Sequence, residues 1–267
     1  VNVAERRVCE VNPDTASQTA AAWGEVLKAL ALSEVTRASR QYHMRVALYT
    51  RQLDRNGRFL SQTQSERDGS TVQPFKAVSA DSLARYGYVE VEGVNSTYHG
   101  PDAQVLLSDA FARTHCLRLV PRESRSTADT GWIGIAFEPI QDDRPDIEGV
   151  LWLDRHSREL REVEFDYVSL HPTLEAARPG GSVMFQPLAP GGWIVSRWWI
   201  RMPVPRVIEE VRRAGTVSRM DVISMQEAGG EVLIASSQNR RIWTGRATGI
   251  QGEVTMECGA PWTGVRL

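Results

Sequence analysis

The stretch from Gly149 to Tyr167 constrains the fold of this chain more than any other part of the sequence. In its second half the apolar residues recur near a period of two, with charged residues between them: Leu160, Val163, Phe165 and Tyr167. Such alternation places apolar side chains on one face of a strand and charged side chains on the other. We therefore predict a β-hairpin that turns at residues 155–158 and packs one face against a core.

Other segments repeat this pattern. Alternating apolar residues begin at Tyr42, and residues 54–57 (Asp-Arg-Asn-Gly) supply a turn before residues 58–62 run back, which predicts a second hairpin. Downstream, Gly and Pro residues separate four further strand segments: 180–186, 191–203, 217–225 and 229–244.

Helical spacing is confined to a smaller part of the chain. Apolar residues Ala16, Ala20, Trp23, Leu27 and Leu30 recur at helical intervals, and Thr15 and Gln18 fit a capping box, so residues 15–32 are predicted to form one amphipathic helix. Two short helices are predicted at 79–86 and 108–114, because each begins at a serine that can cap free backbone N–H groups.

These elements predict an α+β fold that is mostly antiparallel β. We expect a curved, meandering sheet resembling a half-barrel, with the long N-terminal helix over its concave face and short connecting helices. At 267 residues the chain is long enough for one large domain, and residues 1–248 are expected to form it.

The charge balance excludes several classes of function. Lys and Arg total 31, Asp and Glu total 33, and no basic block is present, so the sequence lacks the electrostatic signature of a protein that binds nucleic acid or anionic lipid. The longest apolar runs, such as residues 29–32, are far too short to span a membrane. The start at Val1, with no signal peptide before it, is consistent with a processed N-terminus and predicts export to the periplasm.

Three cysteines stand far apart, at Cys9, Cys116 and Cys258. Their spacing fits neither a CxxC redox pair nor a zinc knuckle, because both need closely spaced thiolates. In an oxidising compartment one disulfide and one remaining thiol are expected, and the alternative is three reduced, buried cysteines.

A search for catalytic or metal-binding motifs yields weak candidates only. His156 and Glu159 have the His-x-x-Glu spacing of a zinc site, but no histidine follows His171 and the pair falls in a predicted turn. His115-Cys116 could form a thiol nucleophile with Asp109, but adjacent strand residues point to opposite faces, which favours a disulfide cysteine beside a packed histidine.

The acidic stretch 142–148 is interrupted by Arg144 and Pro145, which favours a solvated loop over a calcium site. No nucleophile elbow, phosphate-binding loop or zinc-protease motif is present in the sequence. We therefore predict no catalytic residue, cofactor site or metal site, and a protein that is not an enzyme.

One segment is rich in tryptophan and arginine: Trp193, Arg197, Trp198, Trp199 and Arg201. Because strand residues alternate, Trp198 and Trp199 must point to opposite faces, so one of them faces away from the core. Aromatic residues beside arginine are typical of interface centres, which makes these five residues a candidate protein or lipid interface. The alternative is core packing with a covered outer face.

Several segments together resemble a family of exported bacterial proteins with carboxypeptidase regulatory-like domains, which are abundant in gemmatimonads. The residues that carry this resemblance lie in segments 74–75, 83–88, 98–111, 115–116, 134–139, 149–167 and 193–203. They cover most of residues 9–235 and are structural rather than chemical. The hairpin-rich layout is also similar to the half-barrel of lipoprotein-carrier proteins, which can hold an acyl chain.

Residues 249–267 resemble the opening hairpin of the regulatory-like β-sandwich module, with a turn around 259–261. That module has no cysteine at the position of Cys258, so the resemblance implies that Cys258 is unpaired and favours a Cys9–Cys116 disulfide.

The expected function is that of a non-catalytic periplasmic subunit, without a cofactor, that docks by protein–protein contact on a larger membrane-bound complex. For a gemmatimonad-like source, one candidate is a photosynthetic reaction centre complex. The alternative function is a periplasmic carrier or sensor of a lipid or other apolar ligand.

Overall fold

A large antiparallel sheet dominates the computed structural model, which describes residues 9, 13–70, 77–92, 95–121, 131–189, 191–212, 215–245, 254–256 and 265–266. Seven of its strands form a continuous meander: β5 (His115–Pro121), β6 (Trp132–Pro139), β7 (Asp146–Asp154), β8 (Leu160–Val168), β9 (Gly180–Leu188), β10 (Gly192–Arg212) and β11 (Gly215–Ser237). Beyond β11 the sheet continues with β1 (Tyr42–Asp54) and β2 (Phe59–Gly69), while β12 (Arg240–Thr244) also pairs with β11. Local hairpins therefore build the described sheet except at two junctions, that of β1 with β11 and that of β2 with the short C-terminal strand β13 (Val254–Met256).

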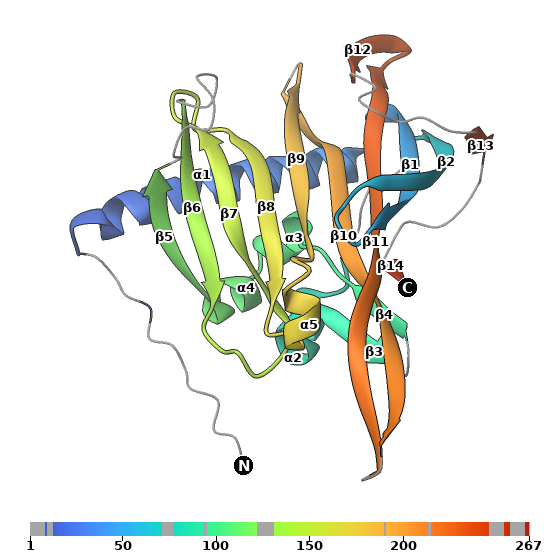
Figure 1. Ribbon diagram of the computed structural model, residues 1–267. Coiled ribbons are helices and arrows are strands. Elements are labelled where there is room, and N and C mark those ends of the chain that lie inside the picture. The colour runs from blue at the N-terminus through green and yellow to red at the C-terminus, as the bar shows by residue number, and fades with distance from the viewer. Residues whose placement is uncertain are drawn as a thin grey trace.

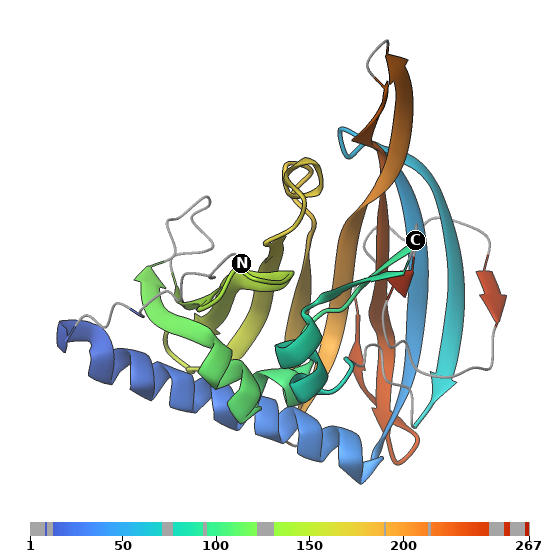
Figure 2. The ribbon, with the colours of Figure 1, turned by 90° about the horizontal axis from the view of Figure 1, so that it is seen from below.

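The sheet curves, and helix α1 (Pro13–Ser39) crosses one of its faces from β5 toward β1 (Figures 1 and 2). We call the face that packs against α1 the inner face and the opposite one the outer face. The inner face holds the hydrophobic core, in which Leu30 of α1 is packed with Leu151, Val163 and Trp198 of the sheet. The predicted mostly antiparallel α+β fold, with a curved half-barrel sheet and one long N-terminal helix, is confirmed.

Helix α1 runs seven residues beyond its predicted end at residue 32. A hydrogen bond explains part of this difference, because the backbone N–H of Trp193 donates to the buried hydroxyl of Thr36 over 3.0 Å. The same hydroxyl donates to the backbone carbonyl of Leu32 over 2.8 Å. Tertiary contacts with β10 thus support a last turn that apolar periodicity alone does not mark.

Residues 77–92 and 95–114 contribute side chains to the hydrophobic core that α1 and the sheet share. This segment comprises α2 (Ala80–Tyr86), β3 (Val89–Glu92), β4 (Asn95–Tyr98), α3 (Ala103–Leu106) and α4 (Asp109–Thr114). The predicted serine caps are confirmed, since the Ser79 and Ser108 hydroxyls accept from the backbone N–H groups of Ser82 and Phe111. Asp102 caps α3 and also accepts the backbone N–H of Ala77 over 2.9 Å, which ties the start of the segment to the start of α3. The remaining short helix, α5 (Pro172–Glu175), links β8 to β9.

The two strands predicted at 217–225 and 229–244 are instead one continuous strand, β11, followed by the short β12. Gly229 and Gly230 do not break the strand. A Cβ atom at Gly229 would lie 2.5 Å from the Tyr49 ring, and one at Gly230 would lie 2.7 Å from the Trp198 indole nitrogen. The glycines therefore make room for two large rings on opposite faces of the sheet.

Strand β10 likewise continues past Pro203, where the sequence predicted its end. Its pairing with β11 shifts by one residue between Val204 and Pro205, and the two strands then run on together to Arg212 and Gly215. Neither β10 nor β11 has another described partner along this extension.

At the C-terminal end, β13 (Val254–Met256) pairs in parallel with β2, and β14 (Val265–Arg266) pairs with β4 in a small sheet with β3. The hairpin predicted for 249–267 would have paired these two strands with each other. In the described residues they pair with different partners, and the predicted turn at 259–261 lies outside those residues.

Candidate functional site

The five predicted interface residues lie on both sides of the sheet. Trp198 is 1% exposed and Trp193 is 7% exposed, and both belong to the core. Trp199 points to the opposite face from Trp198, as the alternation requires, and is half-buried on the outer face together with Arg197 and Arg201. The outer face therefore keeps three of the five as candidates for contact with a partner.

The strand register brings further side chains beside Trp199 and Arg201. In the register of β11 with its two neighbours, Trp199 and Tyr49 both lie opposite Gly229, while Arg201 and Arg51 both lie opposite Glu227. We call Tyr49, Arg51, Trp199, Arg201 and Glu227 the outer-face cluster. Residues from three strands, far apart in the sequence, thus meet on one face.

Glu227 lies at the centre of the cluster and is 4% exposed. Its Oε2 accepts two hydrogen bonds from Arg201, from Nη2 at 2.7 Å and from Nε at 3.1 Å. Its Oε1 accepts one from Nη1 of Arg51 and one from the hydroxyl of Tyr49, each at 3.2 Å. A buried carboxylate with four charge-assisted or hydroxyl donors is satisfied, which holds the donors in fixed positions.

Ring contacts order the two guanidinium groups further. The Cζ atom of Arg51 lies 4.3 Å from the ring centre of Tyr49, and that of Arg201 lies 5.2 Å from the ring centre of Trp199. Nε of Arg51 also donates to the side-chain oxygen of Gln62 over 2.6 Å. Burial, and after it the negative charge of Glu227, raises the pKa of Tyr49, so its phenol stays protonated at neutral pH.

This arrangement suits recognition better than acid–base chemistry. Each carboxylate oxygen of Glu227 already accepts two hydrogen bonds, so this group is not free to act on a substrate. Arg201 still exposes 39% of its side chain beside the half-buried Trp199. The sequence analysis missed Tyr49, Arg51 and Glu227. The pairing of β10 with β11 brings Glu227 to Arg201, and the pairing of β1 with β11 adds Tyr49 and Arg51.

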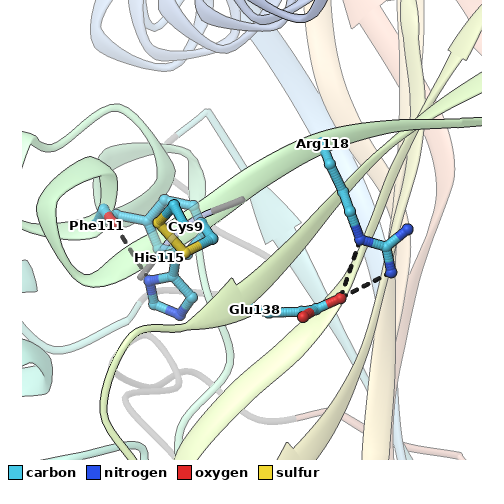
Figure 3. Close-up of a disulfide and its surroundings, with 6 residues drawn as sticks. Cys9, Phe111, His115, Arg118 and Glu138 are labelled. Atoms are coloured by element: carbon cyan, nitrogen blue, oxygen red, sulfur yellow. Dashed lines mark hydrogen bonds and ion pairs between the residues drawn. A yellow bond between two sulfur atoms is a disulfide. The ribbon is translucent and has the colours of Figure 1, made fainter. Parts of the chain in front are cut away.

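A disulfide joins Cys9 to Cys116 at the β5 edge of the sheet, with Cα atoms 5.3 Å apart (Figure 3). This is the pairing that the resemblance favoured. Cys116 lies opposite Glu138 in the β5–β6 register. Arg118, two residues further along β5 and on the same face, donates to Glu138 over 2.7 Å. Cys258, the predicted unpaired thiol, lies outside the described residues.

His115 points to the inner face and is packed, as predicted. Its ring stacks on Phe111 with centroids 4.2 Å apart, and its Nε2 lies 3.2 Å from a carboxylate oxygen of Asp146. Both side chains are almost fully buried, at 1% and 6% exposure. This buried pair links the start of β5 to the start of β7. Asp109, which the sequence analysis considered as a partner of His115 and Cys116, is exposed.

Of the weak metal motifs, only the His-x-x-Glu pair lies where the sequence placed it. The acidic stretch is not a solvated loop throughout, because Asp146 and Glu148 belong to β7 and Asp146 is buried against His115. His156 belongs to the exposed turn between β7 and β8, where its backbone N–H donates to Asp154. Within the described part of the chain, no group of three or more His, Cys, Asp or Glu side chains could hold a metal ion. In the same part, no helix is both long and apolar enough to cross a membrane.

Comparison with known proteins gives little further guidance. No family model and no curated protein matches this chain, and nothing supports the resemblance to carboxypeptidase regulatory-like proteins. Among solved structures, a LolA superfamily protein from Nitrosomonas europaea is 11% identical, with a TM-score of 0.30 over 79% of this chain and 94% of that one. An outer membrane lipoprotein-sorting protein domain from Vibrio parahaemolyticus is 9% identical, with a TM-score of 0.32 over 85% and 95%. Both names match the lipoprotein-carrier layout to which the sequence is similar.

Proposed function

We propose that this protein is a non-catalytic, exported binding protein that docks by protein–protein contact on a larger membrane-associated assembly. The outer-face cluster carries this proposal. Trp, Tyr and Arg are the residues that most often dominate binding energy at interfaces. Here Glu227 holds them in place before any partner arrives, which lowers the entropy lost when a partner binds.

The disulfide supports the exported location. Disulfides persist in oxidising compartments such as the periplasm and are rare in the cytosol. The identity of the assembly, for which the sequence analysis named a photosynthetic reaction centre complex as one candidate, stays a prediction.

The experiment is gentle detergent extraction of the host membrane, followed by size-exclusion chromatography and mass spectrometry of the fractions that contain this protein. The proposal expects stoichiometric co-elution with a membrane complex. The variants Trp199→Ala and Arg201→Ala should each lose this co-elution. Arg118→Ala is the matched control, because Arg118 is also an outer-face arginine paired with a glutamate, but lies at the far edge of the sheet.

Elution as a free monomer or dimer would refute docking. Equal co-elution of all variants would show that another surface binds the assembly, and would remove the outer-face cluster from the proposal.

A carrier of lipid or another apolar ligand is the second candidate, and the curved half-barrel sheet favours it. The inner face argues against it, because side chains from residues 77–92 and 95–114 pack into the hydrophobic core on that face. Tyr98 of this segment and Tyr167 of the sheet are each 1% exposed and meet edge to face at 5.1 Å. Solvent extraction of the purified protein and mass spectrometry would decide: a stoichiometric lipid would favour the carrier.

A further inference from the structure

The side of α1 that faces away from the sheet carries few charges for a surface in contact with water. Figure 2 shows α1 along one side of the molecule, with the sheet and short helices on its other side. On the free side, Leu32 and Val35 are 45% and 65% exposed. A helix surface that stays in water is normally lined with charged or polar residues, so this face has the composition of a covered surface.

Residues on this side follow a heptad pattern. Intervals of four and three residues connect Ser17, Ala21, Gly24, Lys28, Ala31 and Val35. Five of the six are exposed, and Lys28 is the only charged one. Spacings of four and three are typical of the seam where two helices pair side by side. We call these six residues the heptad face.

The sizes of these residues match an antiparallel second copy. If two α1 helices pair with a two-fold axis near Val26, each large residue meets a small one across the interface: Val35 meets Ser17, Leu32 meets Ala20, and Lys28 meets Gly24. A Cβ atom built on Gly24 has no other atom within 4 Å, so the space above this glycine is open. Small residues opposite large ones allow two helix backbones to approach closely.

The charges match the same arrangement. Lys28 is 70% exposed and forms an ion pair of 2.7 Å with Glu25 of its own helix. In the antiparallel register, Lys28 also comes beside Glu25 of the partner subunit, and the two-fold axis repeats this contact. A single charged residue within a mostly apolar seam is a common way to fix register and orientation. The helix dipoles, being antiparallel, add a favourable contribution.

We propose that two copies of this protein associate through the heptad face of α1, as an antiparallel helix pair centred near Val26. The paired segment from Ser17 to Val35 is about 28 Å long at 1.5 Å per residue. One helix pair gives an interface at the small end of the range for specific association, so the dimer is concentration-dependent. The proposal does not rest on the outer-face cluster, which lies on the other side of the sheet.

Sedimentation equilibrium over a wide range of protein concentration tests this proposal. The wild type should show a monomer–dimer equilibrium. Gly24→Leu should abolish the dimer, because the added side chain occupies the space into which Lys28 of the partner subunit packs. The substitution should not unfold the monomer, since Gly24 has open space above it and leucine favours a helix more than glycine does. Gln18→Leu is the matched control, an exposed residue of α1 outside the heptad face.

A charge exchange tests the role of Glu25 and Lys28. Lys28→Glu should weaken the dimer at least tenfold, because it places like charges together. Adding Glu25→Lys to that variant should restore the dimer.

Cysteine cross-linking tests the orientation in a Cys258→Ser background. A mixture of the Gly24→Cys and Lys28→Cys variants should form a mixed disulfide dimer, while either variant alone should form little. Strong cross-linking of each variant with itself would contradict the antiparallel register. A wild type that sediments as a monomer at every concentration, or a dimer that survives Gly24→Leu, would overturn the proposal.

Discussion

Replacing Gly229 with alanine tests the central contact between β1 and β11. The added Cβ would lie 2.5 Å from both Cζ and Oη of Tyr49 and 2.7 Å from the backbone oxygen of Trp198. Ordinary contacts are about 1 Å longer, so the Tyr49 ring must move. That movement breaks the hydrogen bond from the Tyr49 hydroxyl to Glu227 and shifts the ring from beneath Arg51.

The expected effect follows from three contributions. Overpacking costs about 1–3 kcal/mol, and loss of a hydrogen bond to a charged group costs about 1.5–3 kcal/mol. Replacement of glycine recovers about 0.5–1 kcal/mol through the lower entropy of the unfolded chain. We expect Gly229→Ala to lower the free energy of unfolding by about 1.5–5.5 kcal/mol.

Urea denaturation, followed by tryptophan fluorescence, measures this change. Gly131→Ala is the control, since an added Cβ there also meets no atom within 4 Å, and the free energy of unfolding should change by less than about 1 kcal/mol. In a Tyr49→Ala background, Gly229→Ala should cost less than in the wild type, because the clash with the ring is gone and only the contact with the Trp198 backbone oxygen remains. If Gly229→Ala is as stable as the wild type, then the Tyr49 ring does not lie over Gly229 and the packing described for the outer-face cluster is wrong.

Three further predictions concern stability. Glu227→Gln should lower the free energy of unfolding by about 2–4 kcal/mol in urea, because two arginines lose their shared carboxylate; an unchanged value would show that the ion pairs contribute nothing. Burial raises the pKa of Tyr98 from 10.0 to about 12, so the folded protein favours the neutral phenol. The contribution of Tyr98 to the free energy of unfolding is therefore fully present below pH 10, and it falls by up to about 3 kcal/mol as the pH rises to 12, because the unfolded chain ionises first. Urea midpoints measured across this range should decline less steeply in Tyr98→Phe, and an equal decline would contradict the assignment. Cys116→Ser should cost up to about 5 kcal/mol, since the disulfide joins residues 107 positions apart, and a thermal midpoint unaffected by the substitution would exclude that contribution.

Local patterns in the sequence were enough to predict much of the fold. The hairpin of β7 and β8, the serine caps of α2 and α4 and the opposite orientation of Trp198 and Trp199 all depend on residues close together in the chain. The predictions that were wrong concern features that depend on residues far apart in the chain. Gly229-Gly230 has the composition of a break, and only the rings of Tyr49 and Trp198, packed against them in three dimensions, explain why the strand continues.

The residues of the candidate site also separate into those that local sequence can reveal and those that only long-range strand pairing reveals. Trp199 and Arg201 could be found because they lie in one unusual strand, whereas Glu227 shows nothing in the sequence that sets it apart from the other acidic residues. Its role depends on being opposite Arg51 in one register and opposite Arg201 in another. No periodicity within a single segment encodes such a meeting of three strands.

The pairing of β1 with β11 also has a consequence for the order of folding. Strands β5 to β11 can form one after another, each on the strand just made. Strand β1, however, is synthesised early, and its partner at residues 224–237 is synthesised only after strands β2 to β10. Until residues 224–237 are made, the edge of β1 has no partner strand, and the apolar side chains of Val46 and Leu48 are exposed to neighbouring chains. Closure of the sheet is therefore a late step, and bringing β1 and β11 together has a large entropic cost because the loop between them is long. Chains that end before residue 224 should aggregate rather than fold.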